Sequence, residues 1–249
     1  MAQLTIVADK TAMSEAAAER VTRLVETAIS ARGDAAVSLT GGTTPDLLYQ
    51  FLADSKRPWR DRIDWAHVHL FWGDERQVPP DHPQSNFGLA NRLLLQHVPV
   101  PATQIHRMRG ELRASDAGAL YDALLHARRT HVAGPLFDVT LLGIGANAHI
   151  ASIFPNSPVL GGQSQLATGV HVPELSQWRI TMTPPALMDS GAIIVIASGS
   201  SKADAAAATL EGSLDVERYP AQLLRAAGHH VAWIIDSAAS ARLRAVPPA

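Results

Sequence analysis

Residues 40–45 read Thr40-Gly41-Gly42-Thr43-Thr44-Pro45, and this segment decides the fold. It follows a short β-like run over residues 36–39 and precedes a helical pattern that begins at Pro45. A glycine-rich turn between a strand and a helix gathers backbone N–H groups near the positive end of the helix dipole. Such a turn binds a phosphate or a carboxylate, although glycine there can also serve the turn alone. Pro45 suits the first helical position and Thr44 suits the N-cap.

Short apolar runs alternate with helical patterns along the whole chain. The runs cover residues 4–8, 36–39, 67–72, 137–142, 192–197 and 230–235. Several are apolar on both faces, which is typical of parallel strands buried between helices. The clearest helix spans residues 14–32 with Gly33 at its end, and others are expected near 85–97, 115–131, 201–210 and 238–246. The pattern predicts an α/β fold: an open, mostly parallel, Rossmann-like sheet with helices on both faces, in one domain over residues 1–249.

Composition and charge limit the function classes. The chain has 249 residues, a net charge of -2 and no cysteine. The slight acidic balance argues against a dedicated nucleic-acid binder, and no run of about 18 apolar residues predicts a membrane span. The first ten residues lack the basic start and long apolar stretch of a signal peptide. We therefore expect a cytoplasmic protein with neither nucleic acid nor membrane as a partner; oligomeric state stays open.

Polar or ionisable clusters follow several of the expected strands. Besides the glycine-threonine loop, these clusters are 73–76, 143–149 and 198–202. In open α/β sheets ligands bind beyond the carboxyl ends of the strands, so the clusters should meet at one rim. Their convergence is a stronger signal than any one loop.

The cluster Gly73-Asp74-Glu75-Arg76 places two carboxylates and a guanidinium directly after an apolar strand. In an extended segment, Asp74 and Arg76 point to one side and Glu75 to the other. Arg76 could hold an anionic substrate or stabilise developing negative charge. The alternative is a loop salt bridge, which is the usual fate of such a cluster.

His149 is the candidate general base. It follows a glycine-spaced turn at a strand end, and an unperturbed imidazole has a pKa of ~6.5, suited to proton transfer near neutrality. Metal binding is not favoured, because His149 has neither a histidine four residues on nor a cysteine partner. The spacing Gly143-x-Gly145 lacks the third glycine of a dinucleotide site, so nicotinamide binding is not expected. Arg179 and Lys202 are the remaining cationic candidates; the alternative for each is a solvated surface charge.

The ordered set of motifs resembles the 6-phosphogluconolactonase family over nearly the whole chain. The motifs are 40–45, Phe71-Trp72-Gly73-Asp74-Glu75-Arg76 with Val78-Pro79, Ser85-Asn86, residues 143–155, Arg179-Ile180-Thr181 and Gly199-Ser200-Ser201-Lys202. The resemblance implies hydrolysis of 6-phosphoglucono-1,5-lactone, in the oxidative pentose phosphate pathway, without a metal or organic cofactor. It further implies that Gly41, Gly42, Thr43 and Thr44, together with Arg179 and Lys202, hold the substrate phosphate. His149 would activate water, with Asp74 and Arg76 beside the lactone.

One segment departs from the family pattern, which usually reads Asp-Gly-His where this chain has Asn147-Ala148-His149. Asparagine can accept a hydrogen bond from the imidazole but brings no charge, so His149 should be a weaker base. A non-catalytic or weakly active sugar-phosphate binder is therefore one alternative. A related sugar-phosphate isomerase or deaminase is another, although the deaminase pattern has a glutamate immediately before the proline that matches Pro155, where this chain has Phe154.

Overall fold

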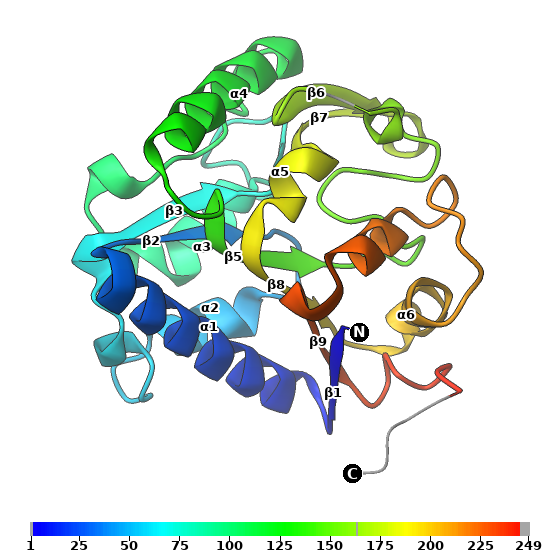
Figure 1. Cartoon of the computed structure of the whole chain (residues 1–249), viewed down its shortest axis with the longest axis horizontal. Helices are drawn as coiled ribbons and strands as arrows, with labels where there is room; N and C mark the ends of the chain where they lie inside the picture. The colour runs from blue at the N-terminus through cyan, green and yellow to red at the C-terminus, as the bar shows by residue number, and fades with distance from the viewer. Residues whose placement is uncertain (1, 163, 245–249) are drawn as a thin grey trace.

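The computed structural model describes residues 2–162 and 164–244, and Figure 1 traces the chain from its first strand to its last. A parallel sheet of six strands forms the centre, in the order β1-β9-β8-β5-β2-β3. The strands are β1 (Gln3–Val7), β2 (Ala35–Leu39), β3 (Val68–Trp72), β5 (Phe137–Gly143), β8 (Ser190–Ala197) and β9 (Val231–Asp236). Each contains or overlaps a run that the sequence predicted as a strand.

Helices connect these strands. The α-helices are α1 (Lys10–Arg32), α2 (Asp46–Ala53), α3 (Asn86–Leu93), α4 (Ala114–His131), α5 (Pro184–Met188) and α6 (Ala203–Leu210). Short 3₁₀ segments are η1 (Arg60–Arg62), η2 (Trp65–His67), η3 (Leu95–His97), η4 (Ala102–Gln104), η5 (Pro158–Leu160), η6 (Pro173–Leu175) and η7 (Ser200–Lys202). A longer one, η8 (Pro220–His230), is kinked at Gly228.

Both faces of the central sheet are buried. Successive side chains of β8 alternate between two hydrophobic clusters: Ile193 and Val195 belong to one, Ile194 and Ile196 to the other. The second cluster contains the apolar sides of α1 and α2, whereas the first contains residues of α4, α5 and η8. The sequence prediction of a mostly parallel sheet covered on both faces is therefore confirmed, and the doubly apolar strands have this physical cause.

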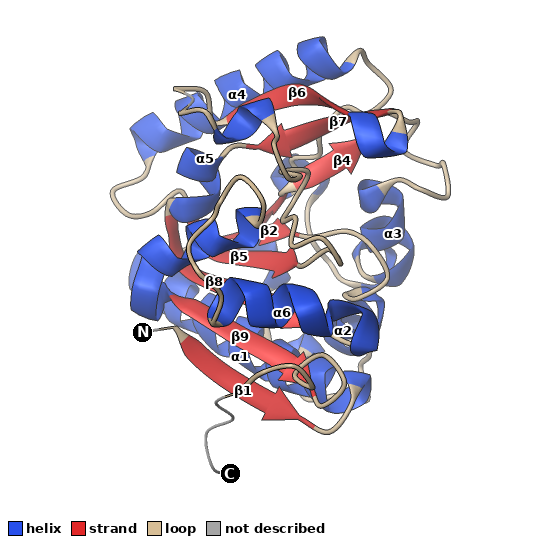
Figure 2. Ribbon diagram, turned by 90° about the vertical axis from the view of Figure 1, so that its right-hand side faces the viewer, coloured by secondary structure: helices blue, strands red, loops and turns tan. Residues whose placement is uncertain are grey.

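A topological switch point lies between β2 and β5. The chain goes from β2 to β3 on one side of the sheet, and from β5 through β8 to β9 on the other. The parallel strands end on the same side of the molecule, as the arrowheads of β5 and β9 show in Figure 2. Loops that leave adjacent strands in opposite directions open a crevice, which is where α/β proteins bind ligands.

A second, antiparallel sheet was not predicted from the sequence. It consists of β4 (Asp74–Arg76), β7 (Gln177–Met182) and β6 (Ala167–Val172), in that order, and it lies beneath α4 in Figure 2. Gly73 joins the two sheets: its N–H donates to the Leu39 carbonyl at 3.0 Å, and its carbonyl accepts from the Met182 N–H at 2.8 Å. The second sheet thereby carries its charged strand β4 to the rim of the first.

Some predicted boundaries were wrong. Helix α1 begins at Lys10 because the Asp9 side chain caps it by accepting from the Ala12 N–H. Helix α2 begins at Asp46, so Pro45 is the N-cap rather than the first helical residue, and Thr44 is not the cap. The helix expected over 238–246 is also wrong where the structure describes it, since residues 237–242 form turns; 245 and 246 lie outside the described residues.

Candidate active site

A cavity of about 600 Å³ lies at the carboxyl ends of the strands, at the switch point. Every residue that the sequence nominated for catalysis or phosphate binding lines it: Gly41, Gly42, Thr43, Thr44, Asp74, Arg76, Asn147, His149, Arg179 and Lys202. Further lining residues are Thr40, Gly143, Ile144, Gly145, Ala146, Ala151, Ser152, Phe154, Glu174 and Leu175. Segments far apart in the sequence thus surround one space.

The glycine-threonine loop is held in place from behind. The buried Tyr49 hydroxyl donates to the Thr40 carbonyl at 2.6 Å and accepts from the Thr40 N–H at 3.0 Å. The Lys10 ammonium donates to the Thr43 carbonyl at 2.7 Å. Gly41 has no room for a side chain, because an added Cβ would lie 1.8 Å from the Asn86 Oδ1 atom. The loop is therefore fixed before any anion binds.

Two arginines face each other across the second sheet. Arg76 on β4 is the direct cross-strand partner of Arg179 on β7. Arg179 is 8% exposed, and the Nε atoms of both side chains are buried without a hydrogen-bond partner. Among the described residues, no carboxylate forms an ion pair with either guanidinium. Like charges directly opposite destabilise a sheet, so this pair favours an anion in the cavity.

The surroundings of Arg179 disfavour its charged form. Burial lowers the pKa of this guanidinium; the Asp74 carboxylate opposes that effect and the Arg76 charge adds to it. Lys202, at the start of α6, is half-buried, and burial likewise lowers its pKa. Both groups thus lose hydration in the folded chain without gaining an ion-pair partner among the described residues.

Asp74 is fixed by two neutral donors. Its Oδ1 atom accepts from the Asn86 Nδ2 at 3.0 Å, and its Oδ2 atom accepts from the Ser152 hydroxyl at 2.6 Å. The side chain lines the cavity beside Arg76, as the alternation of an extended segment predicted. The carboxylate is thereby oriented within the site by Asn86 and Ser152.

Glu75 points away from the cavity, also as predicted. Its carboxylate accepts from the backbone N–H groups of Arg76, Asn86 and Phe87 and from the Ser85 hydroxyl, at 2.7 to 3.0 Å. Burial raises the pKa of this carboxyl, and the same hydrogen bonds oppose the rise. Because Asn86 and Phe87 begin α3, Glu75 anchors the N-terminus of that helix to β4.

His149 lies between an aromatic ring and a glycine. The Phe154 ring stacks on the imidazole with centroids 4.0 Å apart and planes 15° apart. On the other side, a Cβ added at Gly145 would lie 2.0 Å from the His149 Nδ1 atom, so only glycine leaves room for the ring. The Nδ1 atom is 2.7 Å from the Asn147 Oδ1.

The environment keeps the imidazole neutral. Burial lowers the pKa of His149 to about 4; Asp74 opposes this shift, whereas Lys202, Arg179 and Arg76 add to it. A neutral imidazole at neutral pH has a free lone pair and can accept a proton. The geometry can therefore support general-base chemistry next to a cationic anion site.

The turn that carries His149 keeps a left-handed residue at position 148 although glycine is absent. Ala148 adopts φ +62°, and the turn is closed by hydrogen bonds from the Ala148 N–H to the Gly145 carbonyl and from the Gly145 N–H to the His149 carbonyl. An alanine in this region is strained by roughly 1 kcal/mol or more relative to glycine. The backbone course is thus retained at that cost.

Sequence reasoning assigned no role to Ser152 or Glu174, two of the polar residues that line the cavity. Ser152 lies within the motif 143–155, and its contact with Asp74 needs the fold to be seen. Glu174 lies in η6, between β6 and β7, and its carboxylate accepts a hydrogen bond from the Asn147 Nδ2 at 3.1 Å. No sequence signal pointed to Glu174, because the sheet that carries it was not predicted.

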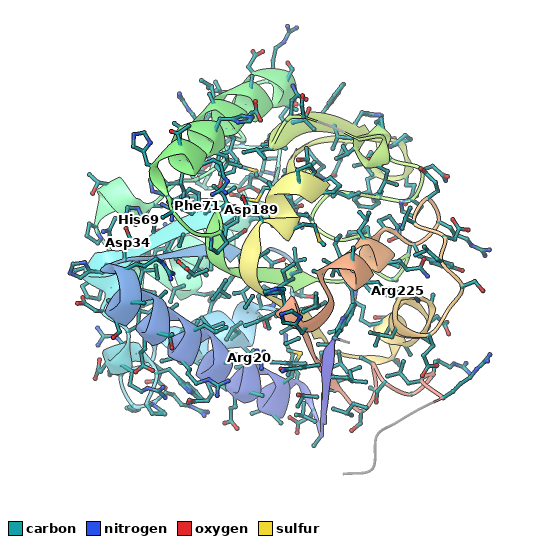
Figure 3. All side chains as sticks on the ribbon, viewed as in Figure 1. Arg20, Asp34, His69, Phe71, Asp189 and Arg225 are labelled. Carbon is teal, nitrogen blue, oxygen red and sulfur yellow. The ribbon has the colours of Figure 1, made fainter. Side chains whose placement is uncertain are left out.

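A pair of histidines, His69 and His106, lies away from the cavity. His69, near the amino end of β3, has its Nδ1 atom 3.1 Å from the His106 Nε2. Figure 3 shows His69 close to Asp34. Because Asp34 directly precedes β2, and His69 is the second residue of β3, the pair lies at the amino ends of the strands, whereas the cavity lies at their carboxyl ends. Over residues 2–162 and 164–244, no group of three or more histidine, aspartate or glutamate side chains is arranged to hold a metal ion. In the same part of the chain, no helix has the length and apolarity to span a bilayer.

Known proteins share this sequence and fold. Residues 8–233 match the family described as glucosamine-6-phosphate isomerases/6-phosphogluconolactonase. The chain belongs to this family. The 6-phosphogluconolactonase of Streptomyces coelicolor is 36% identical over 97% of this chain and 94% of its own length.

Solved structures of two differently named proteins share this fold. The 6-phosphogluconolactonase of Thermotoga maritima is 26% identical, with a TM-score of 0.79 over 95% of this chain and 100% of its own. A monomeric glucosamine-6-phosphate deaminase also has a TM-score of 0.79, over 96% of this chain and 99% of its own, at 22% identity. The second match is evidence of the shared fold alone, so the choice between activities depends on the site.

Proposed function

We propose that this protein hydrolyses 6-phospho-D-glucono-1,5-lactone to 6-phospho-D-gluconate. The observation that carries the proposal is a neutral, hydrogen-bonded imidazole in the same cavity as three cations that lack an ion-pair partner within the described residues. The lactone offers what this cavity fits: an anionic phosphate and an electrophilic carbonyl. Relatives that carry this activity in their names match over 94% and 97% of their own length.

The phosphate would bind at the backbone of Gly41–Thr44, with Arg179 and Lys202 supplying charge-assisted hydrogen bonds. The loop is close to a helix N-terminus, which favours an anion. Arg76, next to Arg179, would lie beside the lactone carbonyl. Asp74, oriented by Asn86 and Ser152, would keep the guanidiniums in place through its charge.

Hydrolysis then needs a proton to move twice. His149 would take a proton at Nε2 from the attacking water while the oxygen bonds to the carbonyl carbon. Arg76 would stabilise the oxyanion of the tetrahedral intermediate. When the ring C–O bond breaks, the imidazolium would return its proton to the departing ring oxygen. The Asn147 amide would accept from Nδ1–H throughout and hold the ring.

The proposed reaction uses no metal or organic cofactor and belongs to the oxidative pentose phosphate pathway. We place it in the cytoplasm, in a chain that works as one domain over residues 1–249. The small-molecule lactone is the only partner that the proposal requires.

The deaminase alternative is less well supported by the site. Position 154 carries a phenyl ring that packs on His149, and a phenyl ring cannot move the protons of a ring-opening step. The binding-only alternative predicts saturable binding of 6-phosphogluconate without acceleration of lactone hydrolysis. That outcome distinguishes it from an enzyme.

The test is lactone hydrolysis by the purified protein, the His149→Ala variant and a His126→Ala control, since His126 is an exposed histidine on α4. General-base assistance is typically worth about 10²–10⁴-fold, so His149→Ala should lose roughly that much in kcat while 6-phosphogluconate binding persists. The control should match the wild type. Full turnover by His149→Ala would move the base elsewhere, with Asp74 as the next candidate.

A further inference from the structure

The side chain of Asn147 connects His149 to a carboxylate from the second sheet. Its Oδ1 atom lies 2.7 Å from the imidazole Nδ1 and 3.3 Å from the His149 backbone N–H. Its Nδ2 atom donates to the Glu174 Oε2 at 3.1 Å. The chain of contacts therefore runs from Glu174 through the amide to the ring.

The orientation of this amide determines which ring nitrogen holds the proton. An amide oxygen only accepts, so an imidazole that bonds to it carries its proton on Nδ1 and keeps a lone pair on Nε2. A reversed amide would present its NH₂ group to Nδ1 and place the proton on Nε2. An imidazole in that tautomer cannot take a proton from water at Nε2.

Asparagine alone does not settle the choice, because the two ends of an amide have nearly the same shape. In a serine protease triad, an asparagine in place of the orienting aspartate gives the wrong tautomer and lowers kcat by about 10⁴. Here the Glu174 carboxylate, which only accepts, demands the NH₂ end of Asn147. Reversal would place the amide oxygen against this carboxylate and the NH₂ group against the His149 N–H.

We propose that Glu174 is a positioning residue that holds the Asn147 amide with its oxygen towards His149 and so fixes the base with its lone pair on Nε2. This inference rests on the proposed lactone hydrolysis. It explains how a chain with asparagine at 147 keeps a competent base. The family pattern places a carboxylate at position 147; here the carboxylate belongs to Glu174 in the β6–β7 connection and acts on His149 through the Asn147 amide.

Glu174 acts through orientation rather than through its field. The charges that shift the His149 pKa belong to Asp74, Lys202, Arg179 and Arg76. The ring itself is held by Phe154 on one side and by the bare Gly145 backbone on the other. Loss of Glu174 should thus change the tautomer while the ring stays in place.

Substitutions at 174 and 147 test this proposal together. Glu174→Ala should lower kcat about twofold or more with KM unchanged, because without the carboxylate the reversed, inactive amide orientation becomes populated alongside the competent one. Glu174→Gln, whose carbonyl still accepts from Asn147, should recover most of the loss. Glu217→Ala, which removes an exposed glutamate outside the cavity lining, is the matched control.

The decisive comparison uses Asn147→Asp as background, because a carboxylate has no wrong end. There Glu174→Ala should cost nothing and should raise kcat, since it removes a like charge from beside Asp at 147. An equal loss in both backgrounds would mean that Glu174 serves only the structure, and the proposal would be overturned.

Nitrogen-15 NMR of His149 gives a readout independent of turnover. The wild type should show the proton on Nδ1, and Glu174→Ala should shift population to the other tautomer. An unchanged tautomer in Glu174→Ala would also overturn the proposal. A wild type without lactone hydrolysis would refute the proposed function instead, and the tautomer measurement would still decide the role of Glu174.

Discussion

Replacing Arg179 by methionine should have opposite effects on the free and the ligand-bound protein. Arg179 is buried opposite Arg76, its Nε atom lacks a partner, and burial lowers its pKa. The fold therefore opposes this charge until an anion binds. Arg179→Met keeps much of the side-chain volume and removes the charge, so the free protein should unfold at an equal or higher temperature than the wild type.

The same substitution should weaken binding of 6-phosphogluconate. A charge-assisted hydrogen bond contributes about 1.5–3 kcal/mol, which corresponds to a Kd increase of roughly 10- to 150-fold. A ligand at 100 times its Kd stabilises the wild type by about 2.7 kcal/mol. A 30-fold weaker Kd leaves about 0.9 kcal/mol of that at the same concentration. For a chain of this size the ligand-induced rise in Tm should fall from roughly 5–11 °C to roughly 2–4 °C.

Thermal unfolding with and without 6-phosphogluconate, together with titration calorimetry, measures both effects. Arg32→Met is the matched control, because Arg32 pairs with Asp138 at the other end of the strands. Its ligand-induced shift should equal that of the wild type. If Arg179→Met destabilised the free protein and left the ligand-induced shift intact, Arg179 would be structural, and the anion site would lose its main support.

Further predictions address the remaining cation, pH and metal. Lys202→Ala should raise the Kd for 6-phosphogluconate roughly 10-fold or more, measured by calorimetry, and unchanged binding would remove Lys202 from the site. The folded-state pKa of His149 is about 4 against ~6.5 when unfolded, so its stabilising contribution is complete above about pH 6.5 and is lost as pH falls towards 4. The full loss in the free energy of unfolding is on the order of 3 kcal/mol. Urea unfolding at pH 7 and pH 4.5 should show it as a difference in stability that shrinks in His149→Ala. In contrast to this stability, kcat/KM should hold down to about pH 5, because the base stays unprotonated there. Hydrolysis should survive exhaustive chelation, whereas activity abolished by chelator and restored by zinc would contradict the mechanism.

The sequence predicted the parts of the fold that depend on burial alone. Strands such as β8 are apolar on both faces because helices cover both faces of the sheet. Such a run is recognisable in the sequence as a buried strand. The second sheet escaped prediction because β4 is three residues long and all three are charged, two carboxylates and a guanidinium. Its pairing with β7 is decided by tertiary contacts that local propensity does not contain.

The same division applies to the site. Asp74, His149 and Lys202 could be nominated because each follows a strand of the central sheet, and strand ends meet at one rim. Glu174 could not, because it reaches Asn147 only through the β6–β7 connection. Nor could the sequence show that Arg76 and Arg179 face each other. Which residues lie opposite each other depends on how β4 and β7 meet in the folded chain, and the composition of the two strands does not determine that.

Strand β4 has a consequence for how this chain tolerates insertions and deletions. Asp74 and Arg76 face the cavity, while Glu75 between them anchors α3. Adding or removing one residue between Gly73 and Asp74 would reverse every side chain of the strand. Glu75, which anchors the helix, would then point into the cavity. The Arg76 guanidinium, which only donates, would take the place of the Glu75 carboxylate and face the backbone N–H groups of α3. Insertions or deletions between Gly73 and Asp74 should therefore reduce activity and stability far more than those in the β6–β7 connection, although both segments are short and lie at the rim of the cavity.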